Sequence, residues 1–83
     1  MSKISKKDLP DIIVKTLKTH GSLTRMEVAW KISPIVKLLV DDNDPFIITW
    51  YYDLGWAKTE LKESGIIGLK KGSEPNKPKW YLK

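Results

Sequence analysis

The chain has 83 residues, of which 41% are hydrophobic and 30% charged, a composition typical of one globular domain rather than a disordered segment. The formal net charge of +5 favours a polyanionic partner such as nucleic acid. The sequence has no cysteine, which excludes disulfides, thiolate zinc sites and a cysteine nucleophile. It shows no signal-peptide pattern and no apolar run long enough to span a bilayer, so we expect a cytoplasmic protein without membrane contact.

Residues 1–7 are polar and basic, and we expect them to form a flexible basic arm ahead of a first helix. That helix is predicted from Asp8 to Thr19, with Asp8 as N-cap and Pro10 in the first turn, where its missing N–H costs nothing. Gly21 is suited to end it. The apolar residues that recur at helical spacing are Leu9, Ile12, Ile13 and Leu17.

A short second helix is predicted from Arg25 to Ile32. It opens on a capping box, in which Thr24 accepts the backbone N–H of Glu27 while the Glu27 side chain reaches back. We expect Pro34 to prevent this helix from continuing unchanged. Residues 33–45 then form either a short strand or an extra helical turn, and the sequence leaves both open.

A third helix is predicted from residue 45 or 46 to Ser64, because Asp44-Pro45 is typical of an N-cap followed by the first helical position. Gly55 lies in its interior, where glycine costs about 1 kcal/mol relative to alanine, so a bend or a helix start nearby stays open. Helical spacing separates the side chains into two sets. The set expected to be buried is Trp50, Asp53, Leu54, Ala57 and Leu61. The opposite set is Tyr51, Tyr52, Gly55, Lys58, Thr59 and Lys62.

After Gly65 the pattern becomes extended: residues 66–70 and 79–82 are predicted strands, joined by a tip rich in turn-forming residues. Residues 66–83 hold five lysines and one glutamate, a local charge of +4. The predicted fold is mainly α with a small β-hairpin, as in a winged helix-turn-helix of three helices and a C-terminal two-stranded wing. Residues 8–83 would form this single domain, with the wing at 66–83. The side chains expected to pack the hairpin over the helices are Ile67, Leu69 and Trp80.

A family resemblance rests on the last third of the chain. Trp56-Ala57-Lys58-Thr59-Glu60-Leu61-Lys62-Glu63-Ser64-Gly65-Ile66-Ile67, followed by a basic turn and Trp80-Tyr81-Leu82, resembles the winged-helix domain at the N-terminus of Mrr-type restriction endonucleases. The resemblance implies a DNA-recognition module without catalytic residues of its own. A small transcription regulator or a stand-alone restriction-type recognition domain would fit it. The wing is longer here than in the family, because Gly72 lies eight residues before Trp80.

The expected DNA-binding residues lie on the third helix and the wing. A helix fits the major groove of B-DNA, and lysines beside it neutralise phosphates. The side chains expected to face the groove are Tyr51, Tyr52, Lys58, Thr59 and Lys62. Those expected to contact the flanking backbone or minor groove are Lys70, Lys71, Lys77 and Lys79. Arg25 would contact a phosphate beside the start of the second helix. Because it is the only arginine, phosphate and shape contacts should dominate over base readout.

The sequence also leaves open a winged-helix module that binds a protein partner or a second copy, through Trp30, Trp56 or the apolar run 35–40. An enzyme is not expected: Pro10-Asp11 and Glu60-Leu61-Lys62 mimic a metal-nuclease pattern, but both lie on predicted helices. No cofactor, metal ion or small-molecule substrate is expected either. The acidic segment 41–44 lacks the register of a calcium loop, and His20 is a lone residue at a helix end.

Overall fold

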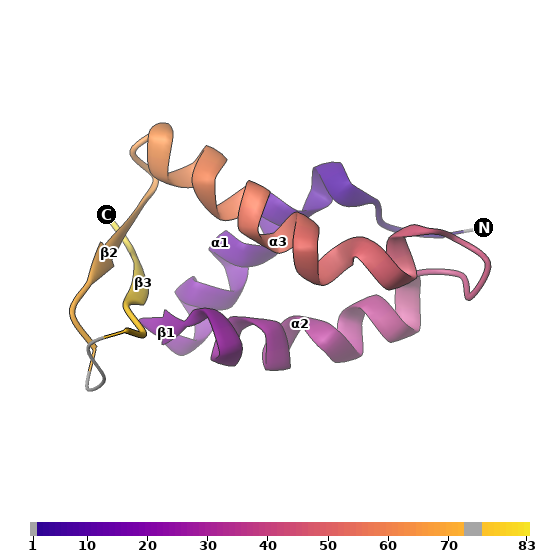
Figure 1. The fold of residues 1–83 in the computed structure, drawn as a ribbon, viewed down its shortest axis with the longest axis horizontal. Helices are drawn as coiled ribbons and strands as arrows, with labels where there is room; N and C mark the ends of the chain where they lie inside the picture. Colours follow the sequence, from indigo (N-terminus) through magenta and orange to yellow (C-terminus); the bar gives the residue numbers. More distant parts are fainter. Residues whose placement is uncertain (1, 73–75) are drawn as a thin grey trace.

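The computed structural model of the chain describes residues 2–72 and 76–83, and it is mainly helical with a small antiparallel sheet (Figure 1). The predicted combination of three helices and a C-terminal hairpin is confirmed. The elements in chain order are the 3-10 turn η1 (Lys6–Asp8), α1 (Leu9–His20), β1 (Leu23–Thr24), α2 (Arg25–Leu39), α3 (Phe46–Glu63), β2 (Ile67–Lys70) and β3 (Lys79–Leu82).

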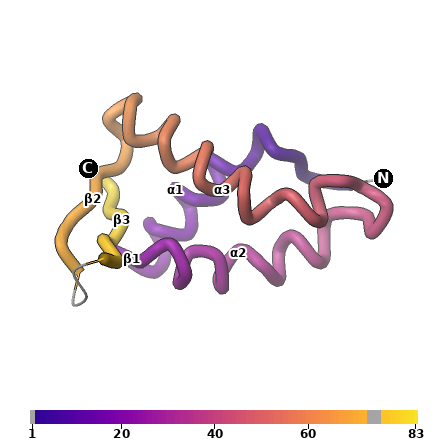
Figure 2. The backbone as a smooth tube through the Cα atoms, in the orientation of Figure 1, coloured from indigo at the N-terminus to yellow at the C-terminus, as the bar shows by residue number. Residues whose placement is uncertain are grey.

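The helices surround one core, and the sheet closes one end of it. In Figure 1, α2 and α3 run in opposite directions along the long axis, α1 lies behind them, and the hairpin lies beside the end of α3 and the start of α2. Figure 2 shows that the connection between α2 and α3 is at the end of the molecule away from the sheet. α1 contacts α2, α3 and β3, and α3 contacts α1, α2 and β2, so these two helices join the sheet to the rest of the core.

The first helix begins and ends close to the predicted residues. Leu9, Ile13 and Leu17 are buried, as their spacing predicts, and Gly21 follows the helix with φ of 82°. Asp8 stands at the N-cap position, but it makes no side-chain capping bond to α1. Its carboxylate instead accepts the backbone N–H of Ser5 at 2.8 Å, which closes the short turn η1.

The segment before α1 differs from the expected flexible arm, because hydrogen bonds join it to distant residues. The backbone N–H of Lys3 donates to the Leu39 carbonyl at 2.7 Å, and Ser2 Oγ donates to the Asp44 carboxylate at 2.7 Å. Ile4 packs against the core. Ser2 and Asp44 are 42 residues apart, so no local sequence pattern could have predicted this contact.

The second helix is longer than predicted. It contains 15 residues and continues through Pro34 to Leu39, so the prediction that it stops near Ile32 is wrong, as is the strand alternative for residues 33–45. A proline in a helix interior costs about 3 kcal/mol. The second half of α2 offsets this cost by burying Val36, since burial of one such side chain contributes about 1.5–3 kcal/mol, and Pro34 itself lies on the exposed side.

The third helix confirms the predicted bounds and the predicted buried side. The N-cap position is occupied by Pro45 and not, as predicted, by Asp44. Asp44 still satisfies one free N–H of the first turn, because its Oδ1 accepts the Phe46 N–H at 3.0 Å. The helix is continuous through Gly55. Among the buried polar groups, the Asp53 carboxylate accepts a hydrogen bond from Thr49 Oγ1 at 3.0 Å. The buried residues are Phe46, Asp53, Leu54, Ala57 and Leu61, and Trp50 is half-buried.

The sheet contains the predicted hairpin and one strand that was not predicted. β3 is the central strand, in the order β1-β3-β2, and both pairings are antiparallel. Leu23 pairs with Trp80, whose ring is buried against the helices together with Ile67. Two residues cannot show an alternating pattern of their own, so β1 is recognisable only through its pairing with β3.

Candidate nucleic-acid interface

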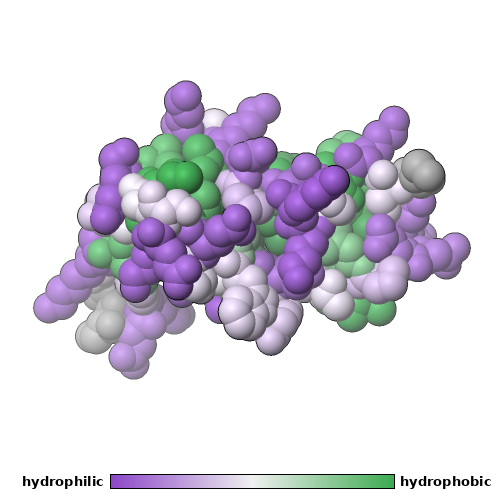
Figure 3. Space-filling view, turned by 90° about the horizontal axis from the view of Figure 1, so that it is seen from above, coloured by the Kyte–Doolittle hydropathy of each residue, from purple (hydrophilic) through white to green (hydrophobic). Residues whose placement is uncertain are grey.

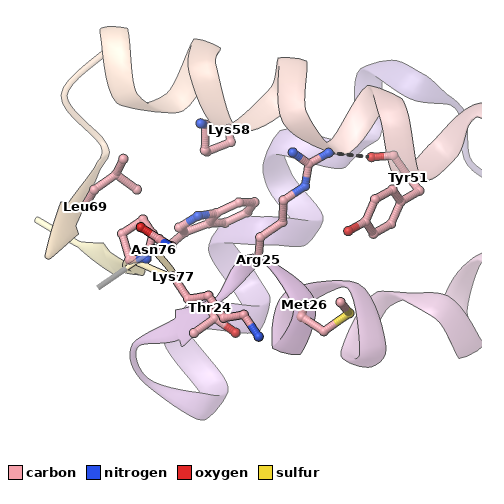
Figure 4. Close-up of a pocket in the computed structure, with 10 residues that line it drawn as sticks. Thr24, Arg25, Met26, Tyr51, Lys58, Leu69, Asn76 and Lys77 are labelled. Atoms are coloured by element: carbon pink, nitrogen blue, oxygen red, sulfur yellow. Dashed lines mark hydrogen bonds between the residues drawn. The ribbon is translucent and has the colours of Figure 1, made fainter. Parts of the chain in front are cut away.

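A concavity of about 280 Å³ opens where the start of α2, the side of α3 and the hairpin meet. Figure 4 shows that side chains from all three elements converge on it. Its floor is largely apolar, and its rim carries three cationic side chains. The lining residues are Thr24, Arg25, Met26, Tyr51, Lys58, Leu69, Asn76, Lys77, Pro78 and Trp80.

Arg25 occupies the centre of this region. It is the first residue of α2, yet its side chain crosses to α3 (Figure 4). Arg25 Nη2 donates to the Tyr51 backbone carbonyl at 3.2 Å, and the guanidinium carbon lies 4.9 Å from the centre of the Tyr51 ring. These two contacts place the guanidinium against α3, and the residue remains exposed.

The structure brings four of the ten predicted DNA-binding residues together around the concavity: Arg25, Tyr51, Lys58 and Lys77. One side of α3 carries Tyr51, Lys58 and Lys62, because Lys58 follows Tyr51 by seven residues and Lys62 follows Lys58 by four. Lys62 is exposed. Three predicted residues on α3 do not line the concavity, and Lys62 is one of them. Of the other two, Tyr52 is 67% exposed, and Thr59 is half-buried and donates from Oγ1 to the Gly55 carbonyl.

The remaining lysines lie on the hairpin. Lys70 and Lys79 are direct partners across β2 and β3, an arrangement in which two like charges repel. Lys70 Nζ lies 5.8 Å from the centre of the Tyr81 ring, and Lys71 is exposed just beyond the strand. An anion beside this face would relieve the repulsion between the paired lysines.

Among the described residues that line the concavity, none is an aspartate or a glutamate, and the Glu27 carboxylate in the first turn of α2 has a structural role. The Glu27 carboxylate accepts the Thr24 backbone N–H at 3.0 Å, and these hydrogen bonds to Thr24 lower the pKa of Glu27 below its ordinary value. The charge of Lys79 lowers the same pKa further, so part of that lysine's field acts on α2. The capping box predicted for Thr24 and Glu27 is confirmed.

The outer side of α3 is a mixed surface. Figure 3 looks onto it from above the view of Figure 1 and shows hydrophilic side chains across this face, with apolar ones between them and at its ends. Tyr52 and Trp56 meet edge to face with ring centres 6.4 Å apart. Trp30 and Trp56 are exposed, as predicted, but Trp56 lines a different concavity together with Lys6 and Lys7.

Some lining residues were missed by sequence reasoning. Asn76 and Pro78 flank Lys77 in the hairpin, and their turn-forming character was the available signal. Met26, 46% exposed, carried no signal, because its place at the concavity depends on how α2 packs. Glu74, at the hairpin tip, lies outside the described residues.

Other chemistry is sparse in the part of the chain that the structure describes. No group of three metal-ligating side chains occurs there. The segment 41–44 contacts the start of α3 through Asp44, and its hydrogen bonds to Ser2 and to the Phe46 N–H lower the pKa of that carboxyl. Within residues 2–72 and 76–83, no helix is long and apolar enough to cross a bilayer.

Comparison with known proteins gives no further assignment. No family model, curated protein or solved structure matches this chain. The functional argument therefore depends on the residues and on the geometry described above.

Proposed function

We propose that this chain is a non-catalytic winged-helix protein that binds duplex DNA through α3 and its lysine-rich hairpin. The observation that carries the proposal is the convergence of Arg25, Lys58 and Lys77, from three separate elements, on one concavity beside the exposed side of α3. Cationic side chains that lie close together repel one another. A polyanion bound at the same place offsets this repulsion, so a cluster of cations favours the binding of a polyanion.

Two features of the fold support the winged-helix assignment. The element order is helix, strand, helix, helix and hairpin, and the short strand β1 pairs with the last strand to give the order β1-β3-β2. This places the hairpin next to α3, as a wing must be to contact DNA beside a helix in the groove. The likeness of residues 56–82 to the Mrr-type N-terminal domain supports the same assignment.

The size and charge of the elements also fit the proposal. α3 has 18 residues, and one side of it carries Tyr51, Gly55, Lys58 and Lys62, while the exposed Glu60 and Glu63 lie at other positions around the helix. The major groove of B-DNA admits such a helix. The lysines of the hairpin would then contact phosphates beside the groove, and each such contact releases counterions.

The test is the salt dependence of binding to a fluorescently labelled duplex of mixed sequence, followed by fluorescence anisotropy. We expect the affinity to fall steeply between about 50 and 200 mM salt, with a log–log slope of about −0.9 for each phosphate contacted. Lys58→Gln and Lys71→Gln should each reduce the slope by about 1. Lys15→Gln removes the same charge from α1, on a surface away from the concavity, and should leave the slope unchanged. No binding at about 50 mM salt would refute the proposal.

A second candidate function is favoured by the exposed apolar side chains of α2. Trp30 is 67% exposed and Leu38 is 82% exposed, and exposed apolar patches commonly mark protein interfaces. A second copy of the chain or a protein partner could cover them. Sedimentation equilibrium tests the self-association form of this idea, and a monomer across the micromolar range would exclude it at those concentrations.

A further inference from the structure

Arg25 is the first residue of α2, but its side chain lies against the surface of α3. Its Nη2 donates to the Tyr51 carbonyl at 3.2 Å, and its guanidinium lies over the Tyr51 ring. This side of α3 also carries Lys58 and Lys62. A helix placed in the major groove by these side chains would bring the Arg25 guanidinium into the groove with it.

Gly55 makes room for the guanidinium. A Cβ atom added at this glycine would lie 3.2 Å from Arg25 Nη2, closer than most real Cβ contacts, and 3.5 Å from its Cζ, an ordinary van der Waals contact. Gly55 has no positive φ, so its backbone conformation does not require glycine. Glycine weakens a helix interior relative to alanine. The three atoms nearest to the added Cβ all belong to the Arg25 guanidinium, so a side chain at position 55 would shift the guanidinium from this place.

The fixed position of the guanidinium favours a base over a phosphate as its target. A phosphate contact needs charge and tolerates a mobile side chain, as the exposed lysines nearby provide. A base contact needs a planar pair of donors at a defined place, and Arg25 is the only arginine in the sequence. Its guanidinium has five N–H donors, and the bond to Tyr51 uses one.

From these observations we propose that Arg25 donates two hydrogen bonds to the O6 and N7 atoms of a guanine in the major groove. Guanine presents both acceptors on one edge, at the spacing that the guanidinium fork matches. Tyr51 and Gly55 act as positioning residues that hold the fork against α3. This assignment rests on the proposed DNA binding, and it makes a guanine at one fixed position of the target the specificity determinant.

The experiment selects preferred duplexes from a random-sequence pool with the unaltered protein and with Arg25→Lys. We expect the unaltered protein to enrich one guanine position and to bind the selected duplex about 5-fold to 150-fold more tightly than a duplex changed at that guanine. Arg25→Lys keeps the charge and loses the fork, so this discrimination should fall to within about twofold. Far-UV circular dichroism of the variant checks its fold.

A change on the DNA makes the test independent of protein folding. Replacing the selected guanine by 7-deazaguanine removes the N7 acceptor, and it should weaken binding by the unaltered protein but not by Arg25→Lys. An unchanged guanine preference in Arg25→Lys, or a uniform loss on all duplexes, would overturn the assignment and leave the proposed DNA binding standing. Absence of any duplex binding would overturn the proposed function and this assignment with it.

Discussion

Replacing Gly55 by alanine tests both the helix and the position of Arg25. Alanine is favoured over glycine in a helix interior by about 1 kcal/mol. Against this gain, the new Cβ would lie 3.2 Å from Arg25 Nη2, so the guanidinium must move by a few tenths of an ångström. The most that movement can remove is the hydrogen bond to Tyr51 and the ring contact, each worth about 0.5–1 kcal/mol at an exposed site.

The expected result in Gly55→Ala is an unfolding free energy within about 1 kcal/mol of that of the unaltered protein, measured by urea denaturation. In the background of Arg25→Ala nothing opposes the new methyl group, so the same change should raise stability by the full 1 kcal/mol or so. That gain corresponds to a melting temperature about 4–8 °C higher for a domain of this size. The difference between the two backgrounds is the coupling between residues 25 and 55.

The reasoning would be refuted if Gly55→Ala lost 1 kcal/mol or more in both backgrounds, because glycine would then be required for a reason unrelated to Arg25. Gly21→Ala is a useful contrast. Gly21 has φ of 82°, a conformation that side chains adopt at a cost, so alanine should destabilise there although nothing lies within 4 Å of the added Cβ.

Three further outcomes follow from the fold. Pro34→Ala should raise the unfolding free energy, by up to about 3 kcal/mol, because Pro34 is exposed inside α2; a loss of stability in urea denaturation would contradict this. Gly72→Ala should lower the melting temperature and weaken the hairpin, since a Cβ there would lie 2.6 Å from the Lys77 carbonyl oxygen; unchanged amide exchange in β2 and β3 would argue against it. The pKa of Glu27 is lowered in the folded state, so its stabilising effect is complete above its ordinary value of 4.5 and is lost as the pH falls through the lowered pKa. Unfolding free energies measured from pH 7 down to about 2 should show this decline, and Glu27→Gln should flatten it; equal declines in both proteins would assign it to other carboxylates.

Local patterns were sufficient for most elements. The spacing of apolar residues placed α1 and both sides of α3, since each buried stripe repeats at the helical period within one element. The start of α2 was marked by Thr24 and Glu27, and the start of α3 by Asp44 and Pro45. Both signals are local, because the groups that end a helix lie within one turn of it. The hairpin followed from two extended runs around turn-forming residues.

Features that depend on distant residues were wrong or missing. The length of α2 could not be predicted, because the penalty at Pro34 is local while the burial of Val36 that offsets it comes from packing. The strand β1 exists through its pairing with β3, and the segment before α1 is held by partners such as Asp44. A sequence window contains none of these partners.

The candidate site shows the same division. The sequence by itself identified the cationic and aromatic side chains, because charge and helical position are properties of the residues. Only the tertiary structure decided that Arg25 lies on α3, beside Tyr51 and over Gly55. The physical reason is that a long side chain at the start of one helix reaches whatever surface packs against it, and that surface is set by the core rather than by its neighbours in sequence.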